Sequence, residues 1–146
     1  MANILILEDD RELTEDWREA FVAAGHQVWT TESAASAIEL LKEIEFDFLL
    51  VDIFIRRSGK LVPDGGVKLI AHLRKNSSVG AAPWWRTVPI LAISGAMSVH
   101  GGYDPLETAR AFGATSWVRK PISPKRLVDA AEQMMSGVTD PIAPGA

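Results

Sequence analysis

The sequence of 146 residues contains no cysteine, which excludes disulfides, thiolate metal sites and a cysteine nucleophile. It also has no apolar run long enough to cross a membrane, and its first residues lack the basic segment of a signal peptide. Lysine and arginine are scattered along a chain whose net charge is −4, so no patch indicates nucleic acid binding. We therefore expect a cytoplasmic protein that binds neither membranes nor nucleic acid directly.

The remaining composition is that of an ordinary globular protein, with 47% hydrophobic and 23% charged residues. The length fits one domain with a sizeable core. We expect this domain at residues 1–136. Residues 137–146, in which glycine, proline and alanine are frequent, are expected to form a disordered tail.

Five short segments have the residue types of β-strands, and those that are continuously apolar indicate strands buried on both faces. They are residues 3–7, 26–31, 48–52, 89–94 and 115–118. Apolar residues at helical spacing, with caps at Ser33 and Ser123, predict the helices that alternate with them. These helices are expected at residues 13–24, 34–44, 65–75, 104–112 and 124–135. This alternation predicts an α/β fold, a single parallel sheet with helices on both faces.

Two segments, Ile53–Asp64 and Asn76–Val88, show neither a helical nor a strand period and are expected to be long loops. Long loops in compact domains are usually functional or mobile. The first of them carries Arg56, Arg57 and Lys60. These charges could steer an acidic partner or simply be solvated, and we favour solvation.

Polar side chains follow four of the expected strands. The first strand is followed by Glu8, Asp9 and Asp10, the third ends at Asp52, the fourth ends at Ser94, and Lys120 follows the fifth. The carboxyl ends of parallel strands meet at one edge of the sheet, where open α/β folds bind their ligands. Carboxylates that converge there repel one another and require a cation or a raised pKa. Oxygen ligands without histidine or cysteine suit Mg²⁺.

A hydroxyl and an ammonium group at the same edge suit the oxygens of a phosphoryl group. An aspartate beside Mg²⁺ is a competent nucleophile toward phosphorus and forms an acyl phosphate. The residues together therefore predict phosphoryl transfer to an aspartate. Taken singly, Asp52 and Ser94 could be turn residues, Lys120 could be a solvated charge, and Asp10 is more simply explained as a helix cap.

Four motifs resemble those of the receiver domains of two-component response regulators. They are the ILILEDD opening at residues 4–10, LLVD at 49–52, ISG at 93–95 and WVRKP at 117–121. The resemblance extends over residues 3–136. It implies a stand-alone receiver domain with lengthened loops and a flavodoxin-like sheet of strand order 2-1-3-4-5, the order established for that fold.

The resemblance implies the phosphoacceptor and the metal ligands. Asp52 matches the phosphoacceptor of the family, and Glu8 and Asp9 match its acidic pair. These two residues, with Asp52 and the backbone carbonyl of Phe54, would hold Mg²⁺ or Mn²⁺, with Asp9 as the likelier direct ligand of the acidic pair.

The same resemblance implies the residues of the conformational switch. Ser94 matches the hydroxyl that moves to the phosphoryl group, and Lys120 matches the lysine that contacts it. Trp117 stands where the family carries the aromatic residue that moves inward with the hydroxyl. The bond between Lys120 and Pro121 resembles one that is cis in the family, which proline makes accessible.

The implied function is that of a phosphoacceptor in a two-component system or phosphorelay. Such a protein would not be an enzyme, apart from Mg²⁺-dependent self-phosphorylation and slow autodephosphorylation. The donor would be a histidine kinase or a histidine phosphotransfer protein. An unknown downstream protein would bind the face formed by the fourth helix, the fifth strand and the last helix, with the receiver as a monomer or a phosphorylation-dependent dimer. A phosphorylation-independent interaction module on the same fold is the alternative.

The residues two positions after Asp52 and Ser94 are Phe54 and Ala96, whose side chains cannot hydrogen-bond an attacking water. We therefore expect slow hydrolysis of the acyl phosphate. Phe54 also argues against a haloacid-dehalogenase-type hydrolase or mutase, because such enzymes carry a second aspartate at that position. No glycine-rich fingerprint follows the first strand, which argues against nucleotide binding.

Overall fold

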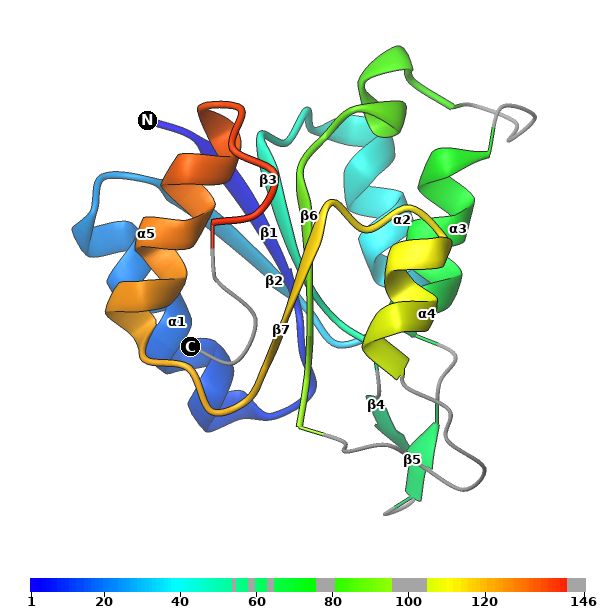
Figure 1. The fold of residues 1–146 in the computed structure, drawn as a ribbon, viewed down its shortest axis with the longest axis horizontal. Helices are drawn as coiled ribbons and strands as arrows, with labels where there is room; N and C mark the ends of the chain where they lie inside the picture. Colours follow the sequence, from blue (N-terminus) through cyan, green and yellow to red (C-terminus); the bar gives the residue numbers. More distant parts are fainter. Residues whose placement is uncertain (54, 58–59, 63–64, 76–80, 96–104, 142–146) are drawn as a thin grey trace.

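The computed structural model describes residues 1–53, 55–57, 60–62, 65–75, 81–95 and 105–141. Its centre is a five-stranded parallel sheet between two layers of helices (Figure 1). The strands are β1 (Asn3–Leu7), β2 (Gln27–Thr31), β3 (Phe48–Asp52), β6 (Ile90–Ser94) and β7 (Ser116–Arg119). Their spatial order is β2-β1-β3-β6-β7, so the expected order 2-1-3-4-5 is confirmed for this sheet.

Each face of the sheet is covered by its own set of helices (Figure 1). One layer consists of α1 (Arg11–Ala23) and α5 (Pro124–Met135), and the other of α2 (Ala34–Glu43), α3 (Gly66–Arg74) and α4 (Pro105–Ala111). Side chains of β1 alternate between the two layers, because successive residues of a strand point to opposite faces. Ile4 and Ile6 pack in the core beneath α1 and α5, whereas Leu5 and Leu7 pack in the core beneath α2 and α3.

The expected helix caps are confirmed. Asp10, Ser33 and Ser123 each accept a hydrogen bond from the backbone amide three residues further on, at the starts of α1, α2 and α5. This contact satisfies one of the amides that have no partner within the helix. Gly25 follows α1 with a φ of +95°, a conformation that glycine adopts without steric cost. The last helix ends at Met135, and disorder of residues 137–146 stays a prediction.

The expectation of a loop at Ile53–Asp64 is wrong. The segment contains an antiparallel hairpin of β4 (Ile55–Arg57) and β5 (Lys60–Val62), which forms a separate two-stranded sheet. Each strand has only three residues, too few to show the alternation by which a strand is recognised in a sequence.

The second expected loop, Asn76–Val88, contains the 3₁₀ helix η1 (Pro83–Arg86) directly before β6. A single helical turn is too short to show a period, so the sequence does not indicate this helix. Trp85 in this turn is buried, and its indole N–H donates a hydrogen bond to the carbonyl of Leu41 at 3.2 Å. The turn therefore contributes to the core beneath α2 and α3.

Because the five strands of the main sheet are parallel, β1, β3, β6 and β7 all end at one edge. The hairpin projects from the same edge (Figure 1). No helix among the described residues is long and apolar enough to cross a membrane.

Candidate functional site

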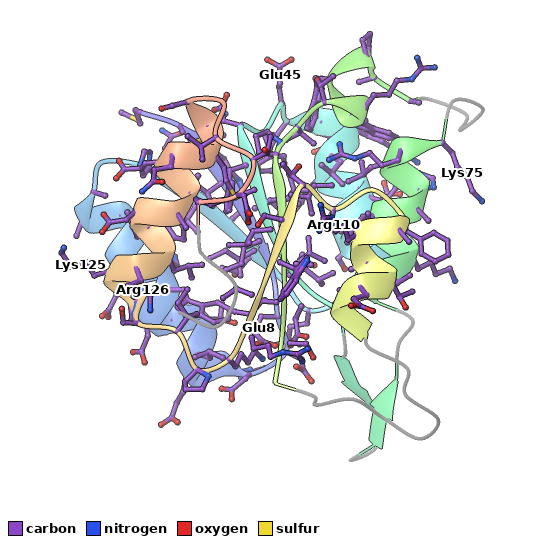
Figure 2. The ribbon with its side chains drawn as sticks, viewed as in Figure 1. Glu8, Glu45, Lys75, Arg110, Lys125 and Arg126 are labelled. Carbon is purple, nitrogen blue, oxygen red and sulfur yellow. The ribbon has the colours of Figure 1, made fainter. Side chains whose placement is uncertain are left out.

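The register of the sheet places four of the expected site residues side by side along this edge. The pairs nearest the edge are, in spatial order, Leu7 with Val51, Asp52 with Ile93, and Ser94 with Arg119. Glu8 and Lys120 each follow one of these paired residues directly. Glu8, Asp52, Ser94 and Lys120 therefore come from four neighbouring strand ends, and Figure 2 shows Glu8 at this edge.

Lys120 connects two buried carboxylates across the sheet. Its Nζ donates to Oε1 of Glu8 at 2.5 Å and to Oδ2 of Asp52 at 2.9 Å. The Glu8 and Asp52 side chains are only 0% and 4% exposed, whereas that of Lys120 is 23% exposed. Buried carboxylates are tolerated when they are paired and hydrogen-bonded, and Lys120 provides both interactions.

Three carboxylates of the site are close enough together to share one cation. Glu8, Asp9 and Asp52 each offer an oxygen within 4.8 Å of the others. The backbone N–H of Asp9 donates to Oε2 of Glu8 at 2.9 Å, which holds these two residues in a fixed relation. Asp9 is half-buried, so this side of the cluster is accessible from solvent. A carboxylate cluster of this kind fits a hard divalent cation that keeps several of its waters.

The electrostatics of the site favour a protonated Glu8 and a charged Lys120. Burial raises the pKa of Glu8 to about 8, and the hydrogen bond and negative charge of Asp52 act in the same direction against the opposing influence of Lys120. Burial alone would lower the pKa of Lys120, but the charge of Asp52 and the hydrogen bonds to Glu8 and Asp52 outweigh it, so this pKa is raised. Near neutral pH, Lys120 therefore remains a cation.

The other expected site residues lie around this cluster. Ser94 is buried at the end of β6, and its carbonyl accepts a hydrogen bond from the backbone N–H of Lys120 at 2.9 Å. Trp117 is half-buried on β7 and packs against the core beneath α2 and α3, outside the carboxylate cluster. The peptide bond between Lys120 and Pro121 is cis. Phe54 lies outside the described residues.

The chain matches a known protein family. The family model described as "Response regulator receiver domain" matches residues 4–132 of the chain. The chain belongs to this family. The resemblance expected from the four sequence motifs is thereby confirmed.

This receiver domain has curated relatives that are considerably longer. The alginate biosynthesis transcriptional regulatory protein AlgB of Pseudomonas aeruginosa is 29% identical over 132 residues, which cover 90% of this chain and 25% of AlgB. The chain thus spans about a quarter of the length of the alginate regulators that it matches.

Solved structures agree in fold. The chemotaxis response regulator CheY4 of Vibrio cholerae superposes with a TM-score of 0.70 at 21% identity, covering 91% of this chain and 98% of that one. The signal receiver domain of a histidine kinase from Syntrophus aciditrophicus gives a TM-score of 0.75 at 20% identity, covering 94% and 92% of the two chains. At these identities the likeness concerns the fold.

Two residues that support the site of the receiver domain are missed by sequence reasoning. Nζ of Lys120 lies 5.9 Å from the ring centroid of Trp17 in α1. The Trp17 side chain is 1% exposed, and the sequence indicates only that it belongs to the apolar face of the first helix. A Cβ at Gly66 would overlap the carbonyl oxygen of Asp52 and the Cα of Ile53. The Gly65–Gly66 doublet was a visible signal for such a close approach, although it does not say which backbone is approached.

Proposed function

We propose that this receiver domain accepts a phosphoryl group on Asp52 in the cytoplasm, from the phosphohistidine of a histidine kinase or histidine phosphotransfer protein, with Mg²⁺ or Mn²⁺. The observation that carries the proposal is the pair of contacts from Lys120 to Asp52 and Glu8, at the edge where three carboxylates converge. A half-buried lysine that is hydrogen-bonded to both carboxylates could stabilise the negative charge of an incoming phosphoryl group.

In the proposed transfer, a carboxylate oxygen of Asp52 attacks the phosphorus and forms a P–O bond. The P–N bond of the phosphohistidine breaks, and its electron pair stays on the imidazole nitrogen. The ring leaves as neutral imidazole because its other nitrogen carries a proton. Lys120 moves its hydrogen bond from Asp52 to an oxygen of the incoming phosphoryl group. Asp9 and Asp52 would hold a divalent cation, which would neutralise the negative charge that the phosphoryl oxygens add to the acidic cluster.

Glu8 and Asp9 have different roles in this proposal. Asp9 is half-buried and offers its carboxylate on the accessible side, which suits a direct metal ligand. Glu8 is buried against Lys120 and keeps that ammonium group at the site when Asp52 becomes modified. The two adjacent acids therefore serve the metal and the lysine, respectively.

The proposed output is a change of the face formed by α4, β7 and α5. Ser94 ends the strand between those of Asp52 and Lys120, within the same edge. Trp117 lies half-buried on β7, where its side chain borders the core beneath α2 and α3. A movement of the Ser94 hydroxyl toward the phosphoryl group would shift Trp117 and alter this face for a downstream protein or a second copy.

Intact-mass spectrometry with acetyl phosphate and Mg²⁺ tests the proposal directly. We expect one phosphoryl adduct on the wild type, none without Mg²⁺ and none on Asp52→Asn. The exposed Asp140→Asn variant is the matched control and should still be modified. No adduct on the wild type, together with tryptophan fluorescence that does not respond to beryllofluoride and Mg²⁺, would reject the proposal in favour of a phosphorylation-independent interaction module.

A further inference from the structure

Both ends of the β4–β5 hairpin are attached to the chain at Asp52. Strand β4 begins at Ile55, and three residues of extended chain span at most about 11 Å. On the return, Gly66 packs so closely on the backbone of Asp52 and Ile53 that a Cβ would overlap it. The hairpin projects beyond the edge at which β3 ends (Figure 1). Along the chain, the hairpin therefore lies within a few residues of Asp52 at one end and of Gly66 at the other.

The hairpin is positively charged within a chain whose net charge is −4. Arg56, Arg57 and Lys60 lie on its two strands, and these strands contain no acidic residue. The hairpin has a backbone register in which Arg57 pairs with Lys60. Within the described residues β4 and β5 pair only with each other. The hairpin therefore adds three positive charges of the sequence close to the end of β3.

The chain as a whole has a charge opposite to that of the hairpin. Its net charge is −4, and phosphodonors are themselves anions. A donor that approaches the molecule is therefore repelled by its net charge. Positive charges next to the phosphorylation site raise the local concentration of an anionic substrate and its association rate.

We propose that the β4–β5 hairpin is an electrostatic guide that attracts small anionic phosphodonors of the acyl phosphate class to Asp52. The inference rests on the proposed phosphorylation of Asp52 and adds a selectivity for negatively charged donors. The charges of Arg56, Arg57 and Lys60 act on the encounter with the donor. Bond formation to phosphorus depends on Asp52 and Lys120, so the guide changes the half-saturating donor concentration and leaves the limiting rate unaltered.

The expected size of the effect follows from Coulomb's law with salt screening. For a dianionic donor about 15 Å from three positive charges in water, neutralising the charges slows second-order phosphorylation about 5-fold at 0.01 M ionic strength and about 2-fold at 0.1 M. Reversing the three charges slows it about 30-fold and about 3-fold, respectively. This dependence on salt distinguishes steering from a structural defect.

The test measures the phosphorylation rate of the full chain with acetyl phosphate and Mg²⁺ at both ionic strengths. One variant neutralises the hairpin with Arg56→Gln, Arg57→Gln and Lys60→Gln, and a second reverses it with three glutamates. The matched control for the reversed variant replaces Lys42, Lys75 and Arg86 by glutamate, which changes the net charge by the same amount. All three residues are exposed. Lys42 lies in the last turn of α2 and Arg86 in η1, directly before β6, and Figure 2 shows Lys75 at the end of α3, far from Glu8.

We expect the hairpin variants to be slowed as calculated, the control to be slowed less than 2-fold, and the difference to disappear at high salt. Phosphoramidate, which carries less negative charge than acetyl phosphate, should be affected less. A wild type that is phosphorylated at the same rate as the neutralised variant, at low salt and with both chains folded by circular dichroism, would overturn the guide alone. A wild type that is phosphorylated by neither donor would overturn the guide, and it would overturn the proposed function as well if tryptophan fluorescence also failed to respond to beryllofluoride and Mg²⁺.

Discussion

We expect the raised pKa of Glu8 to make the affinity of the site for a divalent cation depend on pH. Burial beside Asp52 raises this pKa from 4.5 to about 8, so the side chain holds a proton throughout the neutral range. A cation bound at Asp9 and Asp52, beside Glu8, would compete with that proton. We therefore expect the apparent Mg²⁺ affinity to increase with pH up to about 8 and to level off above it.

The magnitude follows from proton displacement. If one full proton leaves Glu8 for each ion bound, the rise in the apparent dissociation constant approaches tenfold for each pH unit below 8. It is about 50-fold between pH 8, where Glu8 is half protonated, and pH 6. Tryptophan fluorescence titrations with Mg²⁺ at pH 6, 7, 8 and 9 measure this slope. Calorimetry in two buffers of different ionisation enthalpy counts the released protons.

The Glu8→Gln variant separates this explanation from a general effect of pH. It lacks the titrating carboxyl group, so we expect weaker binding than in the wild type at pH 9 and little change between pH 8 and pH 6. A wild-type affinity that does not change over this range would refute the reasoning. The same slope in wild type and Glu8→Gln would show that another group releases the proton.

Three further predictions concern single residues. Lys120→Met leaves the buried carboxyl groups of Glu8 and Asp52 without their partner. We expect it to lower the free energy of unfolding in urea by about 3–5 kcal/mol at pH 7.5 without metal. A loss below 1 kcal/mol would contradict the pairing. Gly66→Ala forces α3 away from the backbone of Asp52 and should lower the free energy of unfolding by about 1–3 kcal/mol, as measured by thermal denaturation. Gly95→Ala is the control, because its Cβ would meet only ordinary contacts at 3.6 Å, and its stability should remain close to that of the wild type. Phe54→Asn provides a side chain that can orient water. It should shorten the lifetime of the Asp52 phosphoryl adduct, as followed by time-resolved mass spectrometry. A lifetime that is short in both proteins and unchanged by the substitution would reject the expectation of slow hydrolysis.

The central sheet could be predicted from the sequence because its inner strands are buried on both faces. The segment Phe48–Asp52 is buried throughout, so its sequence is a continuous apolar run that stops at the edge of the sheet. The polar residues that end these apolar runs could therefore be placed at the ends of the strands. Parallel pairing then brings those ends together whatever the details of the helices.

The hairpin and the division of roles within the site could not be predicted in this way. Three-residue strands have no period, and the basic residues of Ile55–Val62 show no apolar face that would require burial. Glu8 and Asp9 are adjacent acids in the sequence, and nothing in their order shows that Glu8 is buried against Lys120 while Asp9 remains half-buried. That difference arises from the contact between Glu8 and Lys120, which follow β1 and β7 and are 112 residues apart along the chain.

The contacts of Lys120 restrain the nucleophile of the proposed reaction. Lys120 is hydrogen-bonded to Asp52, so one of the two oxygens that could attack phosphorus is occupied by an ammonium group. The proton on Glu8 reduces the negative charge that would otherwise attract a cation. A cation held by Asp9 and Asp52 would compete with Lys120 for Asp52, and its charge would favour loss of the proton from Glu8, which could then retain Lys120 as a carboxylate. Metal binding and exposure of the nucleophile would then be coupled through one proton, and the pH dependence of Mg²⁺ affinity would measure that coupling before any phosphodonor is added.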